Sequence, residues 1–518
     1  MLGACVLNAC AVDADVFTLS ATQTPTESTT APEPAPSTTI EPAQPGDPSP
    51  PTPASTDPAP PSSPEILEPE ILFDVPFADV IDADDNKPPR DHDAFVAVAF
   101  TDIERWWGEV YPEVYGGTYR PLDGGVYAGY PDRVTPVPGC GEPTTDYADL
   151  QLYVAFYCEF GDFMAYDDGD GLDSLLTPLA DAYGAAVMGI VLAHEYGHAI
   201  QARTGALDKL LATIVTEQQA DCFAGAWTGQ AFRGESPLLQ LGDADVRAGL
   251  LAMLEVRDPV GTDQFVPGGH GSAFDRVGAF QEGFVDGPAR CAELLDDPLP
   301  LMPNQFVPGT IDSVRGGNAS YDCTDAITTT CTPAPEFLAE DINDFWVTAL
   351  GLTFEPVGYQ PVAEDFETFD CPQRIDLLPE VAVCVGSRVV AYDEPAVRQL
   401  YDEFGDFTLG YFYGIGWAEL VQQHLASPLV GEPRALLNDC FTGAWVRDIT
   451  PDQFNRTGRT STTVSASPGD LDEAIRIAIL VGDSGLNVDE LGTPFEKIGS
   501  FRTGVLGGLD ACQTQLTG

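Results

Sequence analysis

The chain resembles itself, because segments of its first half return in the same order in its second half. The segment RVGAFQEGFVDGPARC (residues 276–291) aligns without gaps with KIGSFRTGVLGGLDAC (residues 497–512). Upstream, ADCFAGAW (residues 220–227) returns as NDCFTGAW (residues 438–445). A repeat on this scale reuses one structural unit, so it constrains the fold more than any local pattern does. The sequence therefore predicts two homologous domains.

The cysteines follow the same repeat. Four of them keep their order and approximate spacing in each half, and two more lie in a Pro/Gly/Thr-rich segment between the halves. We therefore expect domains at residues 92–300 and 340–518, joined by a connector at 301–339. Sequence alone does not determine disulfide connectivity. The favoured pairs are Cys140 with Cys158, Cys222 with Cys291, Cys323 with Cys331, Cys371 with Cys384, and Cys440 with Cys512.

The N-terminal region has features of an exported and tethered protein. Residues 1–21 begin with an apolar stretch whose LGAC segment, ending at Cys5, resembles a bacterial lipoprotein cleavage site, so that Cys5 would carry a lipid. The stretch is short and no basic residue precedes it, which leaves an accidental match as the alternative. Residues 22–91 form a Pro/Thr/Ser/Ala-rich and acidic segment that we expect to be an extended linker.

The charge of the chain excludes some classes of partner. The sequence has 81 Asp and Glu residues against 23 Lys and Arg, a formal net charge of −58. Binding to DNA or to an anionic membrane surface requires many cationic side chains, so we expect no nucleic-acid partner and membrane attachment only through a lipid anchor. The twelve cysteines include no CxxC pair, which favours disulfides and an extracellular or cell-envelope location.

The segment HEYGH (residues 194–198) has the spacing of a zinc site. His194 and His198 are four residues apart, so a helix places both imidazoles on one face, with Glu195 beside them. The apolar residues before this segment predict a buried helix. Two imidazoles on one helix face can bind Zn²⁺, and the glutamate between them can act as a general base.

A second segment, EQQADCFAGAW, supplies carboxylates for the same site. A zinc site of this kind needs a third protein ligand, and we favour Glu217. Asp221 follows one helical turn later and is the candidate partner that orients an imidazole. The alternative for Glu217 is an exposed helix carboxylate, since spacing alone does not define a ligand.

Four segments together carry a resemblance to a known family. HEYGHAIQ, EQQADCFAGAW, GDADVRAGLLA and HGSAFDRVGAFQEGF resemble the bacterial neutral zinc metallopeptidase family over about residues 95–291. In that family a His-Glu helix and a Glu-x-x-Ala-Asp-Cys helix form a zincin-like site. The resemblance implies zinc peptidase chemistry without implying a substrate. We expect a helix-rich α+β fold with a zincin-like domain in the first half.

The second half acts as an internal comparison. When Gln422 is aligned with Gln201, Ile415 and Glu419 stand opposite His194 and His198, so the ligands are missing. We expect this half to be a degenerate, metal-free copy that serves as a scaffold or binding domain. Asp439 survives opposite Asp221, which suggests that Asp221 also has a structural task.

His270 is lost together with the ligands, because Leu491 stands at its position in the second half. This favours a catalytic role for His270, such as stabilising the oxyanion of the reaction, although a surface histidine is a comparable alternative. Tyr196 and Tyr166 are the other candidates for that role. The acidic run at residues 167–171 is expected to form a solvated turn.

The sequence thus predicts an exported zinc metalloendopeptidase that cleaves peptides or proteins and whose two repeats pack together. The alternative is a non-catalytic cell-envelope binding or scaffold protein with a structural or vestigial zinc site.

Overall fold

The computed structural model describes residues 9–11, 68–171, 173–209, 211–306, 316–324, 331–351, 353–451, 464–482 and 488–517. Cys5 and residues 22–67 of the predicted linker lie outside these ranges. Among the helices of the described ranges, none combines the length and the apolar character needed to cross a membrane.

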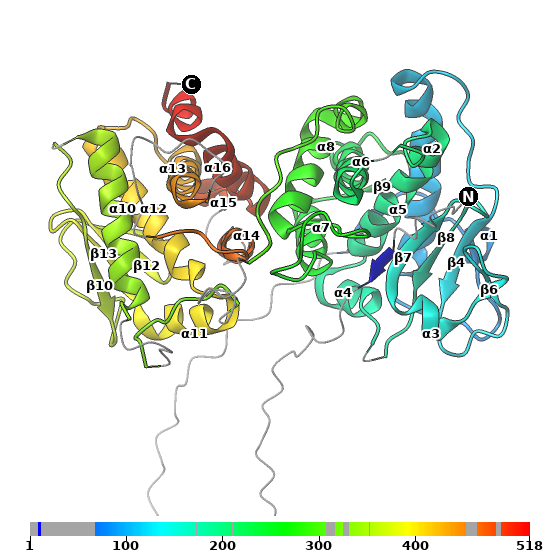
Figure 1. Ribbon diagram of the computed structural model, residues 1–518, viewed down its shortest axis with the longest axis horizontal. Coiled ribbons are helices and arrows are strands. Elements are labelled where there is room, and N and C mark those ends of the chain that lie inside the picture. Colours follow the sequence, from blue (N-terminus) through cyan, green and yellow to red (C-terminus); the bar gives the residue numbers. More distant parts are fainter. Residues whose placement is uncertain are drawn as a thin grey trace, which may run out of the picture. The chain divides into compact units, whose positions relative to one another are not determined.

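The first half contains a mixed sheet with the strand order β1-β7-β8-β4-β3 (Figure 1). β7 and β8 form an antiparallel pair, whereas β8, β4 and β3 run parallel. Every residue of β8 is buried, as expected for an apolar strand inside a sheet. The strands of this half are β1 (Ala9–Ala11), β2 (Glu70–Ile71), β3 (Ile81–Asp82), β4 (Gly125–Gly129), β5 (Val137–Pro138), β6 (Thr144–Thr145), β7 (Tyr153–Cys158), β8 (Phe163–Asp167) and β9 (Leu239–Gln240).

Two buried helices lie at the centre of the first half. In α5 every residue from Ala186 to Gln201 is buried, and the helix is capped by Gly205, whose φ of 70° is the left-handed conformation that favours glycine. α6 is buried from Thr216 to Ala231 and packs against both α5 and α8. The helices of this half are α1 (Phe77–Val80), α2 (Asp93–Val114), α3 (Tyr147–Leu150), α4 (Leu176–Tyr183), α5 (Ala186–Thr204), α6 (Thr213–Phe232), α7 (Asp243–Glu255) and α8 (Ala273–Glu293).

The second half also contains a helix, a mixed sheet and then further helices. Its sheet has the order β10-β13-β12-β11, in which β10 and β13 run parallel, whereas β12 pairs antiparallel with both β13 and β11. The elements are α10 (Ala334–Leu350), β10 (Gly358–Val362), β11 (Arg374–Leu378), β12 (Val381–Cys384), β13 (Val389–Asp393), α11 (Glu394–Phe404), α12 (Phe407–His424), α13 (Glu432–Ile449), α14 (Asp470–Gly482), α15 (Val488–Leu491) and α16 (Pro494–Thr517).

One buried hydrogen bond recurs in both halves. The indole N–H of Trp227 donates to Asp102 over 3.0 Å, and the indole N–H of Trp445 donates to Asp341, also over 3.0 Å. Both tryptophans are fully buried, so the paired carboxylate satisfies a donor that would otherwise be costly to bury. This likeness agrees with a duplication, which itself stays a prediction.

Five disulfides join the ten cysteines from Cys140 onward in the pairs that the sequence favours. Two of them have matching places in the halves. Cys222–Cys291 links α6 to α8, and Cys440–Cys512 links α13 to α16. Each therefore links the two helices of its half that pack most extensively against each other.

The predicted boundaries need correction at two places. Residues 68–91 are not linker, because β2 pairs with β9 and β3 pairs with β4, which makes this segment part of the first half. In the second half, α10 begins at Ala334, before the predicted start at residue 340.

The acidic run after β8 is also different from the prediction. Asp168 is fully buried, and its carboxylate lies 2.9 Å from Lys87 Nζ and 3.1 Å from His92 Nε2. Arg90 donates to the carbonyl oxygen of the same residue over 2.8 Å. A buried charge is tolerated only when it is paired. The segment 87–92 supplies the partners of Asp168, so this residue does not lie in the predicted solvated turn.

Candidate metal centre

Helices α5 and α6 supply the side chains of the candidate centre, and a glycine of HEYGH lets them approach closely. A Cβ atom on Gly197 would lie 3.0 Å from the Cα of Ala220, which is tighter than ordinary contact. This close approach brings the face of α6 that carries Glu217 and Asp221 against the histidines of α5. Helix periodicity places both carboxylates on that one face.

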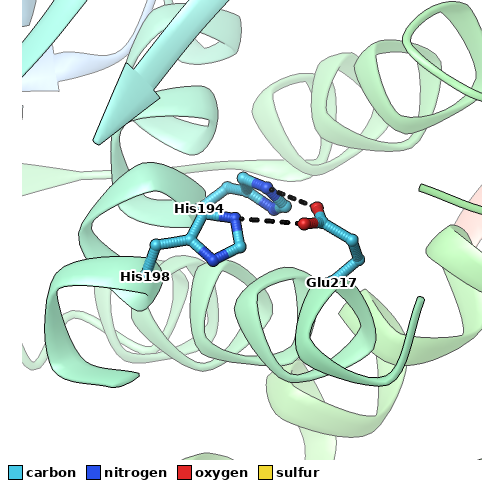
Figure 2. Close-up of side chains that lie close together, drawn as sticks. All are labelled: His194, His198 and Glu217. Carbon is cyan, nitrogen blue, oxygen red and sulfur yellow. Dashed lines mark ion pairs between the residues drawn. The ribbon is translucent and has the colours of Figure 1, made fainter. Parts of the chain in front are cut away.

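The two histidines and Glu217 converge on one point (Figure 2). His194 Nε2 lies 3.3 Å from Glu217 Oε2, and His198 Nε2 lies 3.5 Å from Glu217 Oε1. All three residues are at most 2% exposed. His194 Nε2 and both Glu217 oxygens have no hydrogen-bond partner of normal geometry among the described residues. Such buried, converging ligand atoms are suited to holding a cation.

Neighbouring side chains hold the outer nitrogens of both imidazoles. His194 Nδ1 lies 2.7 Å from Asp221 Oδ1, and His198 Nδ1 lies 2.9 Å from Gln201 Oε1. Gln201 in turn donates to the carbonyl oxygen of Thr216 over 2.7 Å. These bonds direct the Nε2 atoms toward Glu217, as is usual for histidines that bind a metal.

The donor set fits Zn²⁺. Two imidazole nitrogens and one carboxylate are a common set for a catalytic zinc, which keeps one position for water or substrate. His194, His198 and Glu217 would hold the ion, in agreement with the residues singled out in the sequence.

Arg276 of α8 anchors Asp221. Its Nε and Nη2 atoms donate to the two oxygens of Asp221 over 3.0 and 2.8 Å, and its Nη1 donates to the carbonyl of Val256 over 2.6 Å. Burial alone would raise the pKa of Asp221, but Arg276 and His194 lower it below its ordinary value. Asp221 therefore stays ionised while it holds His194.

Glu195 is 1% exposed and lies on the side of α5 that faces the sheet. One of its oxygens accepts a hydrogen bond from the backbone N–H of Tyr157 in β7 over 3.0 Å. Burial raises the pKa of Glu195 above its ordinary value. This carboxyl group therefore takes up a proton more readily than an exposed glutamate does.

His270 reaches the same centre from the loop before α8. Its Nε2 atom lies 3.9 Å from Glu217 Oε2, and its Nδ1 atom lies 3.6 Å from Asp258 Oδ1. Asp258 also accepts the backbone N–H groups of His270 and Gly271 over 2.9 and 2.8 Å. The carboxylate thus fixes the backbone and faces the ring of His270.

The two tyrosine alternatives to His270 lie in different parts of the first half. The hydroxyl of Tyr196 donates to Glu104 over 3.1 Å and is bonded to Tyr119, so it is engaged toward α2. Tyr166 is fully buried in β8.

In the second half a charge pair stands where the sequence alignment places the ligands. Glu419, opposite His198, is 1% exposed and accepts from Nε of Arg434 over 2.9 Å. Among the described residues of this half, no cluster of histidines and carboxylates like that of the first half is found at this position.

Sequence reasoning missed three residues of the centre. Arg276 lies inside a repeated motif, and Lys497 at the aligned position binds Asp439 over 2.8 Å, so the repeat could have identified it. Gln201 serves in the sequence only to align the two halves, and no motif marks it as a partner of His198. Asp258 has no sequence signal, because it contacts the centre only through the folded loop.

The comparisons with known proteins agree with this geometry. Residues 82–294 match the family model described as "Putative neutral zinc metallopeptidase". An uncharacterized protein of Mycobacterium tuberculosis is 31% identical over 169 residues, which is 29% of this chain and 55% of that protein. The uncharacterized protein YpfJ of Escherichia coli is 29% identical over 221 residues, or 38% of this chain and 69% of that protein.

The chain thus spans about half the length of the mycobacterial relative that it matches. No solved structure matches the chain. The HEYGH helix, the helix that carries Glu217 and the loop with His270 all lie inside the matched range. Residues 82–294 are thus similar to the family described as putative neutral zinc metallopeptidases.

Proposed function

We propose that this protein is an exported, zinc-dependent endopeptidase whose substrates are peptides or proteins. The observation that carries the proposal is the buried convergence of His194, His198 and Glu217 beside a glutamate whose pKa burial raises. Zinc, when bound, supplies a Lewis acid for a peptide carbonyl and for the attacking water.

Glu195 acts as the general base in this proposal. Its carboxylate accepts a proton from the attacking water and later delivers it to the nitrogen of the departing amine. A raised pKa suits this role, because the carboxyl group must hold the proton between the two events. The hydrogen bond from Tyr157 N–H keeps the carboxylate in place during the exchange.

His270 stabilises the negative charge that develops on the substrate carbonyl oxygen. Its ring faces the centre at Nε2 and faces Asp258 at Nδ1. A donor held before the reaction begins costs no reorganisation when the charge appears, which is the basis of oxyanion stabilisation.

Five disulfides and the absence of a CxxC pair support an oxidising location outside the cytoplasm. The charge of −58 argues against a nucleic-acid substrate. The second candidate function is a non-catalytic envelope protein that keeps a structural zinc. It is favoured by the loss of the ligands in the second half, where Glu419 stands at the position of His198 and pairs with Arg434.

Two variants separate these functions. Glu195→Gln should keep one zinc per chain and lose at least 10²-fold of its peptide hydrolysis, because only the proton carrier is removed. Glu217→Ala should lose the zinc as well. The assays are metal content by mass spectrometry and cleavage of a broad peptide library. A wild-type protein that carries zinc and cleaves nothing in that library would leave the structural-zinc function in place.

A further inference from the structure

Two side chains of the second half bind the backbone of one residue at the start of α8. The N–H of Phe274 donates to Asp472 Oδ1 of α14 over 3.0 Å, and the carbonyl oxygen of Phe274 accepts a hydrogen bond from Arg502 of α16. Both polar groups of this peptide backbone are thus bonded by residues about 200 positions away in the sequence. Asp472 is 5% exposed and Arg502 is 8% exposed, so neither bond competes strongly with water.

The contact is closely packed. The guanidinium of Arg502 lies 4.3 Å from the ring centroid of Phe274, and a Cβ atom on Gly278 would lie 1.9 Å from Nη2 of Arg502. Only a glycine at position 278 leaves room for this arginine. Asp472 is itself held, since its Oδ2 atom lies 3.1 Å from Nε of Arg257, two residues after the end of α7.

The bonded turn of α8 leads directly to the candidate centre. Arg276 is two residues beyond Phe274 and carries both bonds to Asp221, which holds His194 Nδ1 at 2.7 Å. His270 is four residues before Phe274. Free N–H groups at the start of a helix need partners, and Asp472 supplies one from outside the first half.

We propose that the second half of the chain positions the zinc site, with Asp472 and Arg502 as the positioning residues that act through Phe274 and Arg276. The proposal rests on the zinc site of the proposed function. The second half can perform this task without metal ligands of its own. Displacement of the first turn of α8 would move Arg276 away from Asp221 and release the imidazole of His194.

The test measures zinc directly rather than hydrolysis. The full-length zinc protein is mixed with a chromogenic chelator, and the rate of zinc transfer is recorded at a temperature well below the unfolding transition. Loss of a residue that orients a ligand typically costs 10- to 100-fold in metal affinity. Asp472→Ala and Arg502→Met should therefore release zinc at least tenfold faster than the wild type. Asp472→Asn keeps an acceptor for Phe274 N–H and should release zinc at close to the wild-type rate.

Arg476→Gln is the matched control. Arg476 also joins the halves, through a 2.8 Å contact with Glu255, but it has no bond to α8 in the described structure. Its zinc release should stay within twofold of the wild type. The absorption spectrum of the cobalt-substituted protein should change in Asp472→Ala and not in Arg476→Gln, which a general loss of stability would not produce.

If Asp472→Ala or Arg502→Met fails to fold, Gly278→Ala provides the second route, because its methyl group displaces Arg502. Wild-type zinc release in the folded variants that remove either bond overturns the proposal. Faster zinc release in a protein that cleaves no peptide keeps the positioning role and rejects the peptidase. A wild-type chain that binds no zinc overturns both.

Discussion

Four carboxylates surround the imidazoles of the centre, and their surroundings shift their pKa values in opposite directions. Burial opposes the ionised form of each, but imidazoles lower the pKa of Glu217 and of Asp258, and Arg276 with His194 lowers that of Asp221. For Glu195 burial prevails and raises the pKa. Carboxylates with divergent pKa values in one site indicate different chemical tasks. Glu217, Asp221 and Asp258 interact with imidazole rings or with Arg276. Glu195 is the carboxyl group suited to exchange a proton.

We expect Asp258 to affect peptide hydrolysis only through its contact with His270. Asp258→Asn removes the charge that faces the imidazole, and we expect kcat to fall about 10- to 100-fold with little change in KM. The double variant Asp258→Asn, His270→Ala should be no slower than His270→Ala alone, since the two residues act as one unit. Steady-state kinetics of the three proteins measure this. Independent, multiplicative losses would contradict the coupling.

Asp275, in the first turn of α8, should make the stability depend on pH. Burial raises its pKa from 3.8 to about 7, and one oxygen accepts from Met302 N–H over 3.0 Å. The folded state then binds more protons than the unfolded state between pH 4 and 7. This residue therefore disfavours folding increasingly as pH rises through that window, by up to about 4 kcal/mol.

Asp275→Asn keeps the acceptor and removes the charge. We expect the variant to gain stability over the wild type at pH 8 and to gain nothing at pH 4. Unfolding in urea at both pH values measures the difference. A gain of equal size at both values would show that the carboxyl ionisation is not responsible.

At the scale of elements, the packing of α6 on α8 depends on glycines as well as on the disulfide. A Cβ atom on Gly283 would lie 1.8 Å from the carbonyl oxygen of Cys222, and one on Gly225 would lie 1.9 Å from that of Phe280. The second half has the same arrangement, since a Cβ atom on Gly504 would lie 2.0 Å from the carbonyl oxygen of Cys440. Backbones meet at these points, so a side chain there must push the helices apart.

The same substitution should have opposite effects at two glycines. Gly283→Ala should destabilise the fold by roughly 1–3 kcal/mol, because the rigid backbone of α6 cannot yield. Gly108→Ala, inside α2, meets nothing closer than 3.8 Å and should stabilise by about 0.5–1 kcal/mol through helix propensity. Urea unfolding of both variants checks the signs. A stabilising Gly283→Ala would refute the close packing of α6 and α8.

At the scale of the whole molecule, the net charge of −58 produces a repulsion among carboxylates that lowers the stability of the folded state. Some buried acidic groups are paired with the few cations, as Asp168 is with Lys87 and Asp439 with Lys497. The remaining carboxylates repel one another. Salt shortens the range of this repulsion from about 10 Å at 0.1 M to about 3 Å at 1 M.

The unfolding temperature should therefore rise between 0.1 and 1 M sodium chloride at pH 7. The rise should shrink near pH 4, since the isoelectric point of the sequence is about 4.1. Differential scanning calorimetry at both pH values provides the comparison. An equal rise at both would indicate a general salt effect rather than screening.

The buried helix around HEYGH and the candidate ligands could be predicted because their signals are local. His194 and His198 share a helix face through a spacing of four residues, and Glu217 and Asp221 do the same on the next helix. The repeat pointed to the disulfide pairs that the structure forms. The burial of Asp168 could not be predicted, because an acidic run in a sequence indicates a solvated turn. Only the fold brings Lys87 and His92 beside the carboxylate that follows β8.

The sequence by itself determined the candidate zinc ligands, because helix periodicity and donor chemistry depend only on neighbours along the chain. The tertiary structure decided how those residues are held. Asp258 faces His270 across a loop, Arg276 reaches Asp221 from another helix, and Asp472 reaches Phe274 from the other half of the chain. Such contacts join residues 12 to 198 positions apart, and their geometry exists only once the helices have packed.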